Sequence, residues 1–89
     1  MKYQREFLKD AHKHCTYNES EILKSLLCGC FYCIQNFNSS EIKEWVDSDN
    51  PKGKSALCPN CGIDSVIGDS SSFPINDEIF LKEMYSFWF

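Results

Sequence analysis

The sequence predicts a single small domain of the α+β class, and three observations support this assignment. The chain has 89 residues, so residues 1–89 are enough for one domain and too few for two. Helix start signals alternate with short segments rich in aromatic and β-branched residues. Two Cys-x-x-Cys pairs, with 24 residues between them, offer a way to reinforce a hydrophobic core that is marginal at this length.

The first helix is expected over residues 3–14, where apolar residues recur at helical spacing. The residues on this face are Tyr3, Phe7, Leu8 and Ala11. Residues 1–14 would then be an N-terminal helical extension of the metal-binding part of the domain.

Two further helices are predicted because two segments carry the same start signal. Asn18 and Asn38 can each cap a helix, and a Glu three residues later can reach back to the cap N–H. The signals predict helices over about 19–28 and 39–47. The first would bury Ile22, Leu23, Leu26 and Leu27, and the second Ile42, Trp45 and Val46. A last helix is expected after a cap at Asn76 or Asp77, with Phe80, Met84, Phe87 and Trp88 at helical spacing.

The strands are expected around the cysteine pairs. Residues 28–30 would end the helix that precedes them, and residues 31–37 are rich in β-prone side chains. Ala56 and Leu57 form a short strand before the second pair, and residues 65–67 look like its partner. Residues 47–55 read as a loop and residues 68–72 as a turn.

The two cysteine pairs predict a structural zinc site made by Cys30, Cys33, Cys58 and Cys61. The two-residue spacing forms a tight turn that brings both sulfurs to one side. Gly62 after the second pair permits the positive φ that such a turn often needs. The predicted fold is therefore a zinc-ribbon or treble-clef-like domain with three or four short helices, and Zn²⁺ is the expected cofactor.

The sulfur and imidazole groups also allow roles other than this site. Cys28 could replace Cys30 as a ligand, although a small buried side chain at a helix end is the simpler interpretation. His12, His14 and Cys15 could form a second metal site or supply a ligand, but surface or hydrogen-bonded histidines are expected. Four thiolates could also hold an iron–sulfur cluster, and a lone pair could be redox-active.

Composition and charge narrow the expected location and partners. Residues 1–10 have no apolar signal-peptide core, and no apolar run approaches the length of a membrane span, so we expect a cytoplasmic protein with reduced thiols. The net charge is −4, with nine basic residues scattered among thirteen acidic ones. This balance favours a protein partner over nucleic acid.

The cysteine strings resemble those of a family of small bacterial proteins described only as cytoplasmic proteins. The resemblance rests on SLLCGCFYC at 25–33 and ALCPNCGIDSVIG at 56–68, and it runs from about His14 to Phe89. It includes Ile42, Trp45 and Met84. What it implies is a compact zinc-ribbon or treble-clef-like domain without an established activity, with metal ligands at the four cysteines given above.

Catalysis is not expected. The zinc deaminase and H-E-x-x-H metalloprotease motifs are absent, and four cysteines would leave no open position on the metal. His14, Asp64 and Ser65 form a residue set that could serve a hydrolase, but local hydrogen bonding of Asp64 and Ser65 explains them more simply.

The expected function is zinc-stabilised, non-catalytic binding of a protein partner, as a regulator, adaptor or inhibitor. Aromatic residues crowd the C-terminus, where an exposed patch would mark an interface. They are Tyr85, Phe87, Trp88 and Phe89, of which Phe87 and Trp88 are expected in the core. One alternative is a nucleic-acid-binding ribbon using Lys52, Lys54 and Tyr32, and another is a hydrolase using His14 and Asp64. The sequence predicts neither an oligomeric state nor the identity of the partner.

Overall fold

The computed structural model describes residues 2–89 as a small α+β fold. The α-helices are α1 (Arg5–His12), α2 (Glu19–Leu23) and α3 (Glu78–Trp88). The strands are β1 (Leu27–Cys30), β2 (Gln35–Asn38), β3 (Trp45–Val46), β4 (Ser55–Ala56) and β5 (Val66–Gly68). Three short 3₁₀ turns, at Lys13–Cys15, Ser39–Glu41 and Asp69–Ser71, connect these elements.

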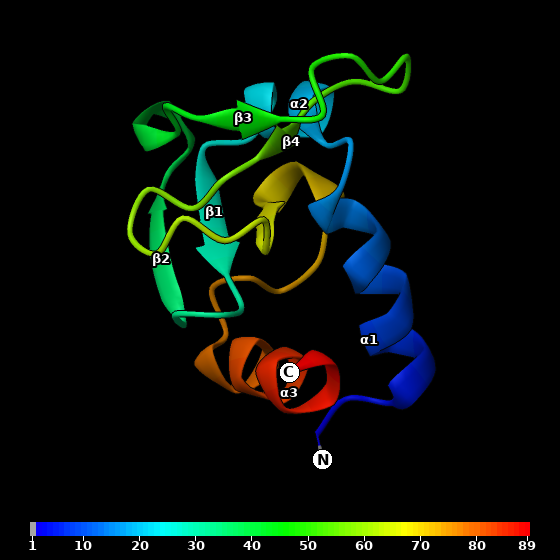
Figure 1. Cartoon of the computed structure of the whole chain (residues 1–89). Coiled ribbons are helices and arrows are strands. Elements are labelled where there is room, and N and C mark those ends of the chain that lie inside the picture. Colours follow the sequence, from blue (N-terminus) through cyan, green and yellow to red (C-terminus); the bar gives the residue numbers. More distant parts are fainter. Residues whose placement is uncertain (1) are drawn as a thin grey trace.

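The strands form two small antiparallel sheets. β1 lies in the middle of the three-stranded sheet, between β2 and β5, while β3 and β4 pair separately. Figure 1 shows α3 across the lower end of the larger sheet, α1 along its right side, and the loop between β3 and β4 projecting at the top. The first cysteine pair lies at the turn from β1 to β2, and the second lies in the segment between β4 and β5.

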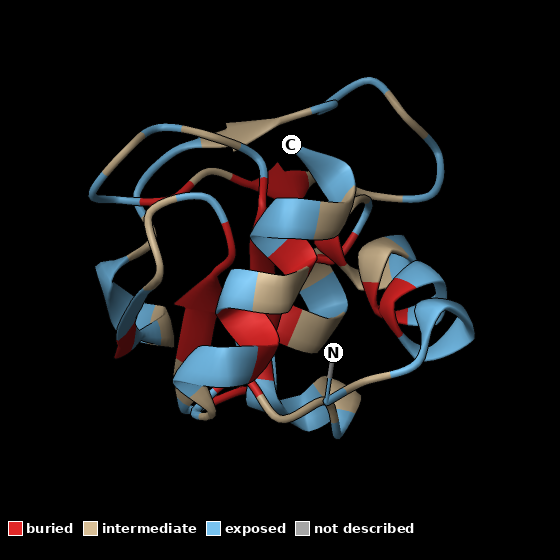
Figure 2. Ribbon diagram, turned by 90° about the horizontal axis from the view of Figure 1, so that it is seen from below, coloured by how far each residue is buried: buried red, intermediate tan, exposed pale blue. Residues whose placement is uncertain are grey.

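Two clusters of buried hydrophobic side chains join the helices to the sheets. The first joins the inner faces of α1 and α3 to β5, and Figure 2 shows the buried side of α3 facing the sheet. It contains Leu8, Ala11, Cys15, Phe31, Ile67, Ile75, Phe80, Leu81 and Met84. The second surrounds the cysteine pairs and contains Ile22, Cys28, Cys30, Phe37, Ala56, Cys58 and Val66. Burial of these side chains supplies the main hydrophobic stabilisation of the fold.

The first and last helices lie where the sequence predicts them. The predicted first helix appears as α1 followed by the Lys13–Cys15 turn, with Leu8 and Ala11 buried. The predicted last helix is α3, and Asp77 is its cap, because its carboxylate accepts a hydrogen bond from the N–H of Ile79 at 3.0 Å. Strong periodicity at both ends made these helices predictable.

The helix predicted over 19–28 is wrong beyond Leu23. Leu23 and Leu26 are 72% and 82% exposed, so the predicted apolar face is not buried as a whole. Leu27–Cys30 instead forms the central strand β1. The backbone groups of this segment bond to strands on both sides, which outweighs the helical spacing of the apolar residues before it.

The helix predicted over 39–47 is also wrong, although its start signal works. Glu41 Oε2 accepts a hydrogen bond from the Asn38 N–H at 2.8 Å, and a single 3₁₀ turn follows. The chain then extends, because Trp45 pairs with Ala56 in the second sheet and the Leu57 N–H bonds the Glu44 carbonyl at 3.0 Å. The residues that this helix was expected to bury are half-buried: Ile42, Trp45 and Val46.

The predicted partner of the strand before the second cysteine pair is wrong as well. Residues 65–67 were expected to pair with Ala56 and Leu57, whereas β5 pairs with β1 and β4 pairs with β3. The expected β-prone segment 31–37 begins with a turn and becomes β2 only from Gln35. The loop predicted over 47–55 lies between β3 and β4, except that Ser55 is the first residue of β4.

Candidate metal centre

Each cysteine pair is shaped by the same backbone turn. Cys30 ends β1, and the Ile34 N–H bonds its carbonyl oxygen at 2.9 Å. Cys58 follows β4, and the Gly62 N–H bonds its carbonyl at 2.9 Å in the same way. Both closing residues have a positive φ, 61° at Ile34 and 78° at Gly62. Gly62 therefore does what its position suggested, while Ile34 takes a conformation that is unfavourable for a β-branched residue.

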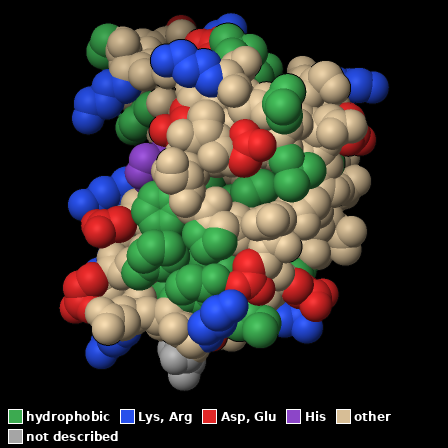
Figure 3. Space-filling model, turned by 180° about the vertical axis from the view of Figure 1, so that it is seen from behind, with side chains coloured by type: hydrophobic (Ala, Val, Ile, Leu, Met, Phe, Trp, Pro, Cys, Tyr) green, Lys and Arg blue, Asp and Glu red, His purple; other side chains and the backbone are tan. Residues whose placement is uncertain are grey.

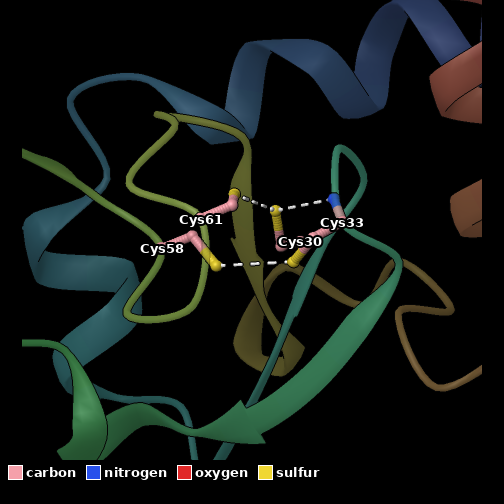
Figure 4. A group of neighbouring side chains, drawn as sticks. All are labelled: Cys30, Cys33, Cys58 and Cys61. Atoms are coloured by element: carbon pink, nitrogen blue, oxygen red, sulfur yellow. Dashed lines mark hydrogen bonds between the residues drawn. The ribbon is translucent and has the colours of Figure 1, made fainter.

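The two turns bring four sulfur atoms together (Figure 4). The Sγ atoms of Cys30 and Cys61 lie 3.6 Å apart, and those of Cys33 and Cys58 lie 3.7 Å apart. All four lie within 4.8 Å of one another. These separations are too long for a disulfide. They match a tetrahedral ion with metal–sulfur distances of about 2.3 Å, whose sulfurs would be about 3.8 Å apart. The four cysteines could therefore hold a metal ion.

Neighbouring donors point at the sulfurs from both turns. The Cys33 N–H points to Cys30 Sγ at 3.5 Å, and the Asn60 N–H to Cys58 Sγ at 3.3 Å. The hydroxyl of Ser65 lies 3.0 Å from Cys30 Sγ. Donors in these positions stabilise thiolates, the form of cysteine that binds metals.

The environment of each thiol sets its proton affinity. Burial opposes ionisation of Cys30, but the N–H groups of Cys33 and Tyr32 and the Ser65 hydroxyl outweigh it and lower its pKa. Burial raises the pKa of Cys33, and the neighbouring Cys30 and Cys58 raise it further. Burial also raises the pKa of Cys61, to about 11. A metal ion that binds here would have to displace protons, so its affinity would rise with pH.

The other two cysteines lie outside this group. Cys28 is fully buried in β1, and burial raises the pKa of its thiol to about 12. Cys15 is buried beside α1, and burial raises the pKa of its thiol to about 12 as well. Both therefore behave as small hydrophobic side chains, and the four-sulfur group contains Cys30 rather than Cys28.

The two histidines contact different residues. His14 Nδ1 lies 2.9 Å from Glu21 Oε1, and its ring packs on Phe73. The ring of His12 packs on Trp88, with 3.9 Å between the ring centroids. Within residues 2–89, the four cysteines are the only metal-competent group, so the HKHC segment does not form a second one.

The residue set proposed for a hydrolase is not assembled. His14 pairs with Glu21, whereas the Ser65 hydroxyl faces Cys30. A groove beside the four-cysteine group has a volume of about 500 Å³ and is lined by residues of the 40–44 and 57–62 segments. Neither His14, Asp64 nor Ser65 lines it. A substrate in that groove would not meet the residues that the hydrolase hypothesis needs.

Aromatic side chains form an exposed surface at the lower end of the molecule, which we call the aromatic surface and define as Tyr32, Tyr85 and Phe89. The Tyr32 ring lies 5.7 Å from that of Tyr85 and 4.9 Å from that of Phe89. Tyr85 is 42% exposed and Phe89 is 58% exposed. A groove of about 360 Å³ adjoins them, lined by Tyr32, Ile34, Lys82, Tyr85 and Ser86. The sequence pointed to the C-terminal aromatics but not to Tyr32 as part of the same surface.

The rings near the aromatic surface have other roles. Phe87 is partly buried against the core, as expected. Trp88 stays more than one third exposed, against expectation, because it lies on His12 rather than inside the core. A separate group of rings, Tyr3, Phe7 and Phe73, packs beside α1. Hydrophobic side chains also gather on the back face of the molecule, in its lower half (Figure 3).

The residues suggested for nucleic-acid binding do not share a surface patch. Lys52 lies in the loop between β3 and β4, with its amino group over the Tyr17 ring at 5.7 Å. Tyr32 instead packs against α3 through Tyr85. Figure 1 places that loop and α3 at opposite ends of the molecule, which separates the charges from the ring that would stack on a base.

No helix among residues 2–89 has the length and apolar character needed to cross a membrane. Comparisons of the chain with protein-family models, with curated proteins and with solved structures find no match.

Proposed function

We propose that this protein is a cytoplasmic, zinc-stabilised domain of the zinc-ribbon or treble-clef kind that binds a protein partner and has no catalytic activity. The observation that carries the zinc assignment is the spacing of the four sulfurs, which suits a tetrahedral ion. Four thiolates fill such an ion's coordination shell, so no position is left for a reacting water. Membership of the small bacterial family that the sequence resembles is part of the same proposal.

The metal assignment is tested by native mass spectrometry of the purified protein. We expect one zinc ion per chain and loss of the folded state when a chelator removes it. Replacing Cys61 with Ser should lower zinc occupancy, whereas replacing the buried Cys15 with Ser should leave occupancy unchanged if the variant folds. A folded protein that contains no metal would overturn the assignment.

The partner proposal rests on the aromatic surface. Exposed rings beside a groove are typical of protein interfaces, where buried aromatic residues supply much of the binding energy. Tyr85 and Tyr32 both line the groove, so a partner's apolar side chain that enters it could contact both rings. Contact there would cover both rings.

The test compares two tyrosine variants. Tyr17 is 39% exposed, close to the value for Tyr85, but it lies near the loop between β3 and β4. We expect Tyr85→Ala to weaken binding of a partner co-purified from the source cell by at least tenfold when binding is remeasured with purified proteins. Tyr17→Ala should leave binding unchanged. Equal binding by all three proteins would remove the aromatic surface from the proposal.

A further inference from the structure

A hydrogen bond to the metal centre comes from a residue outside the cysteine pairs. Ser65 is almost completely buried, and its hydroxyl oxygen lies 3.0 Å from Cys30 Sγ. Cys30 is also fully buried, so water does not compete for this contact. Ser65 follows the second cysteine pair in the chain, yet its side chain contacts the first pair.

The backbone fixes Ser65 in this position. Its carbonyl oxygen accepts a hydrogen bond from the Phe31 N–H at 3.1 Å, directly after Cys30. The next residue, Val66, is the partner of Cys30 in the pairing of β1 with β5. The backbone and the side chain of Ser65 therefore both hold the first cysteine turn, from a position directly before β5.

The chemistry fixes the direction of the hydrogen bond in the metal-bound state. A cysteine that binds a metal has lost its S–H proton, so its sulfur can only accept. The Ser65 hydroxyl must then donate. Such a bond fixes the rotamer of the ligand and offsets part of the thiolate's negative charge, as partners of metal ligands generally do.

We propose that Ser65 is a positioning residue of the metal centre, which donates a hydrogen bond to the metal-bound thiolate of Cys30 and strengthens metal binding. This inference rests on the proposed metal site. It reinterprets a residue that the sequence suggested as part of a hydrolase: its hydroxyl serves the metal centre and is not a nucleophile.

Ser55 provides a matched control, because it is a buried serine with no role at the metal. Its hydroxyl donates to Asp47 Oδ2 at 2.8 Å and accepts from the Tyr17 N–H at 2.7 Å. Ser65→Ala and Ser55→Ala therefore each remove one buried hydroxyl. Both should destabilise the fold, and because metal binding is coupled to folding, both could lower the apparent metal affinity.

The cobalt form separates the two effects, because its sulfur-to-cobalt charge-transfer band reports on the thiolates themselves. We expect Ser65→Ala to shift this band and to weaken Co²⁺ and Zn²⁺ binding by about 10–100-fold in competition with a chelator. We expect Ser55→Ala to keep the wild-type band, and Ser65→Thr, which retains the hydroxyl, to restore it.

An unchanged band in Ser65→Ala, with an affinity loss no larger than that of Ser55→Ala, would overturn the proposal and leave Ser65 a packing residue. A wild-type protein that gives no charge-transfer band with Co²⁺ would instead overturn the metal site itself. The two failures are distinguished by the wild-type spectrum.

Discussion

At the scale of a single residue, Asn18 has a structural role that its local sequence does not indicate. It was predicted to cap a helix, but its side chain makes no cap hydrogen bond. It donates to the carbonyl oxygens of His14 and Val66, both at 2.9 Å, and accepts from the Ala56 N–H at 3.1 Å. This buried amide thus joins three segments that are distant in sequence.

Replacing Asn18 with Ala should therefore be far more costly than loss of a cap. Three backbone groups would lose their partner, two of them in buried hydrogen bonds, and we expect a loss of about 2–4 kcal/mol in the free energy of unfolding. Asn38→Ala is the control, because Asn38 is exposed and should cost about 1 kcal/mol or less. Urea denaturation of the purified proteins measures both losses. Equal losses would contradict the role assigned to Asn18.

His12 gives a pH-dependent prediction. Burial lowers the pKa of its imidazole, and the charge of Asp64 opposes this only in part. The unfolded chain then binds a proton near pH 6.5 that the folded chain binds only at lower pH. Stability contributed by neutral His12 is therefore present above about pH 6.5 and is lost as the pH falls towards the lowered pKa.

The comparison that isolates this effect is between the wild type and His12→Gln. The difference between their unfolding midpoints should change between pH 7.5 and pH 5.5, because the wild type should lose more stability than the variant as the pH falls. Since the thiols also take up protons as the pH falls, only the difference between the two proteins is informative. A difference that stays constant with pH would show that His12 titrates normally.

At the scale of elements, Gly29 explains how the central strand fits between its neighbours. A Cβ atom at Gly29 would lie 3.0 Å from Ile75 Cβ and 3.1 Å from the Ile75 carbonyl oxygen. The Asn36 amide bonds this same carbonyl at 2.8 Å and the Cys28 carbonyl at 3.1 Å. The segment before α3 is thus fastened directly onto the face of the sheet.

Replacing Gly29 with Ala should push this segment away from the sheet. We expect a loss of about 1–3 kcal/mol in the free energy of unfolding, which is typical of overpacking. Thermal unfolding of the purified protein would show this loss as a lower midpoint. An unchanged midpoint would mean that the segment before α3 yields without cost.

The elements also show why part of the fold was predictable. The helices α1 and α3 follow from local periodicity, and the grouping of the four cysteines follows from their two-residue spacing. The strand β1 does not, because it is held between β2, the next strand in the chain, and β5, which lies far along the chain. The contact between Ser65 and Cys30, across 35 positions, has no local signal for the same reason.

At the scale of the whole molecule, the start of the described chain is fastened to α3. The Lys2 and Tyr3 N–H groups donate to Glu83 at 2.6 and 2.9 Å, and the Tyr3 hydroxyl donates to Asp77 at 2.6 Å. Lys2 adds an ion pair with Asp77 at 2.8 Å. Asp77 therefore caps α3 and also anchors the segment that leads into α1.

These contacts predict a second pH dependence of stability, at acidic pH. Hydrogen bonds from Lys2 and Tyr3 lower the pKa of Asp77 to about 2. The stability that its carboxylate contributes is thus present above the unfolded-state pKa near 4 and is lost as the pH falls towards 2. We expect Asp77→Asn to unfold at a lower temperature than the wild type at pH 7, while Asp10→Asn, which alters an exposed helix residue, does not. Equal midpoints for the two variants would contradict the anchoring role.

The loop between β3 and β4 has a practical consequence for the search for a partner. An affinity tag joined to residue 89 would emerge next to the aromatic surface and could shield it, and a tag before residue 2 would start from the α3 side as well. Residues 48–53 project from the opposite end of the molecule (Figure 1). Exposed loop tips of this kind accept insertions readily. A short epitope tag inserted there would leave the rings accessible. A failure to capture a partner could then be attributed to the aromatic surface rather than to the tag.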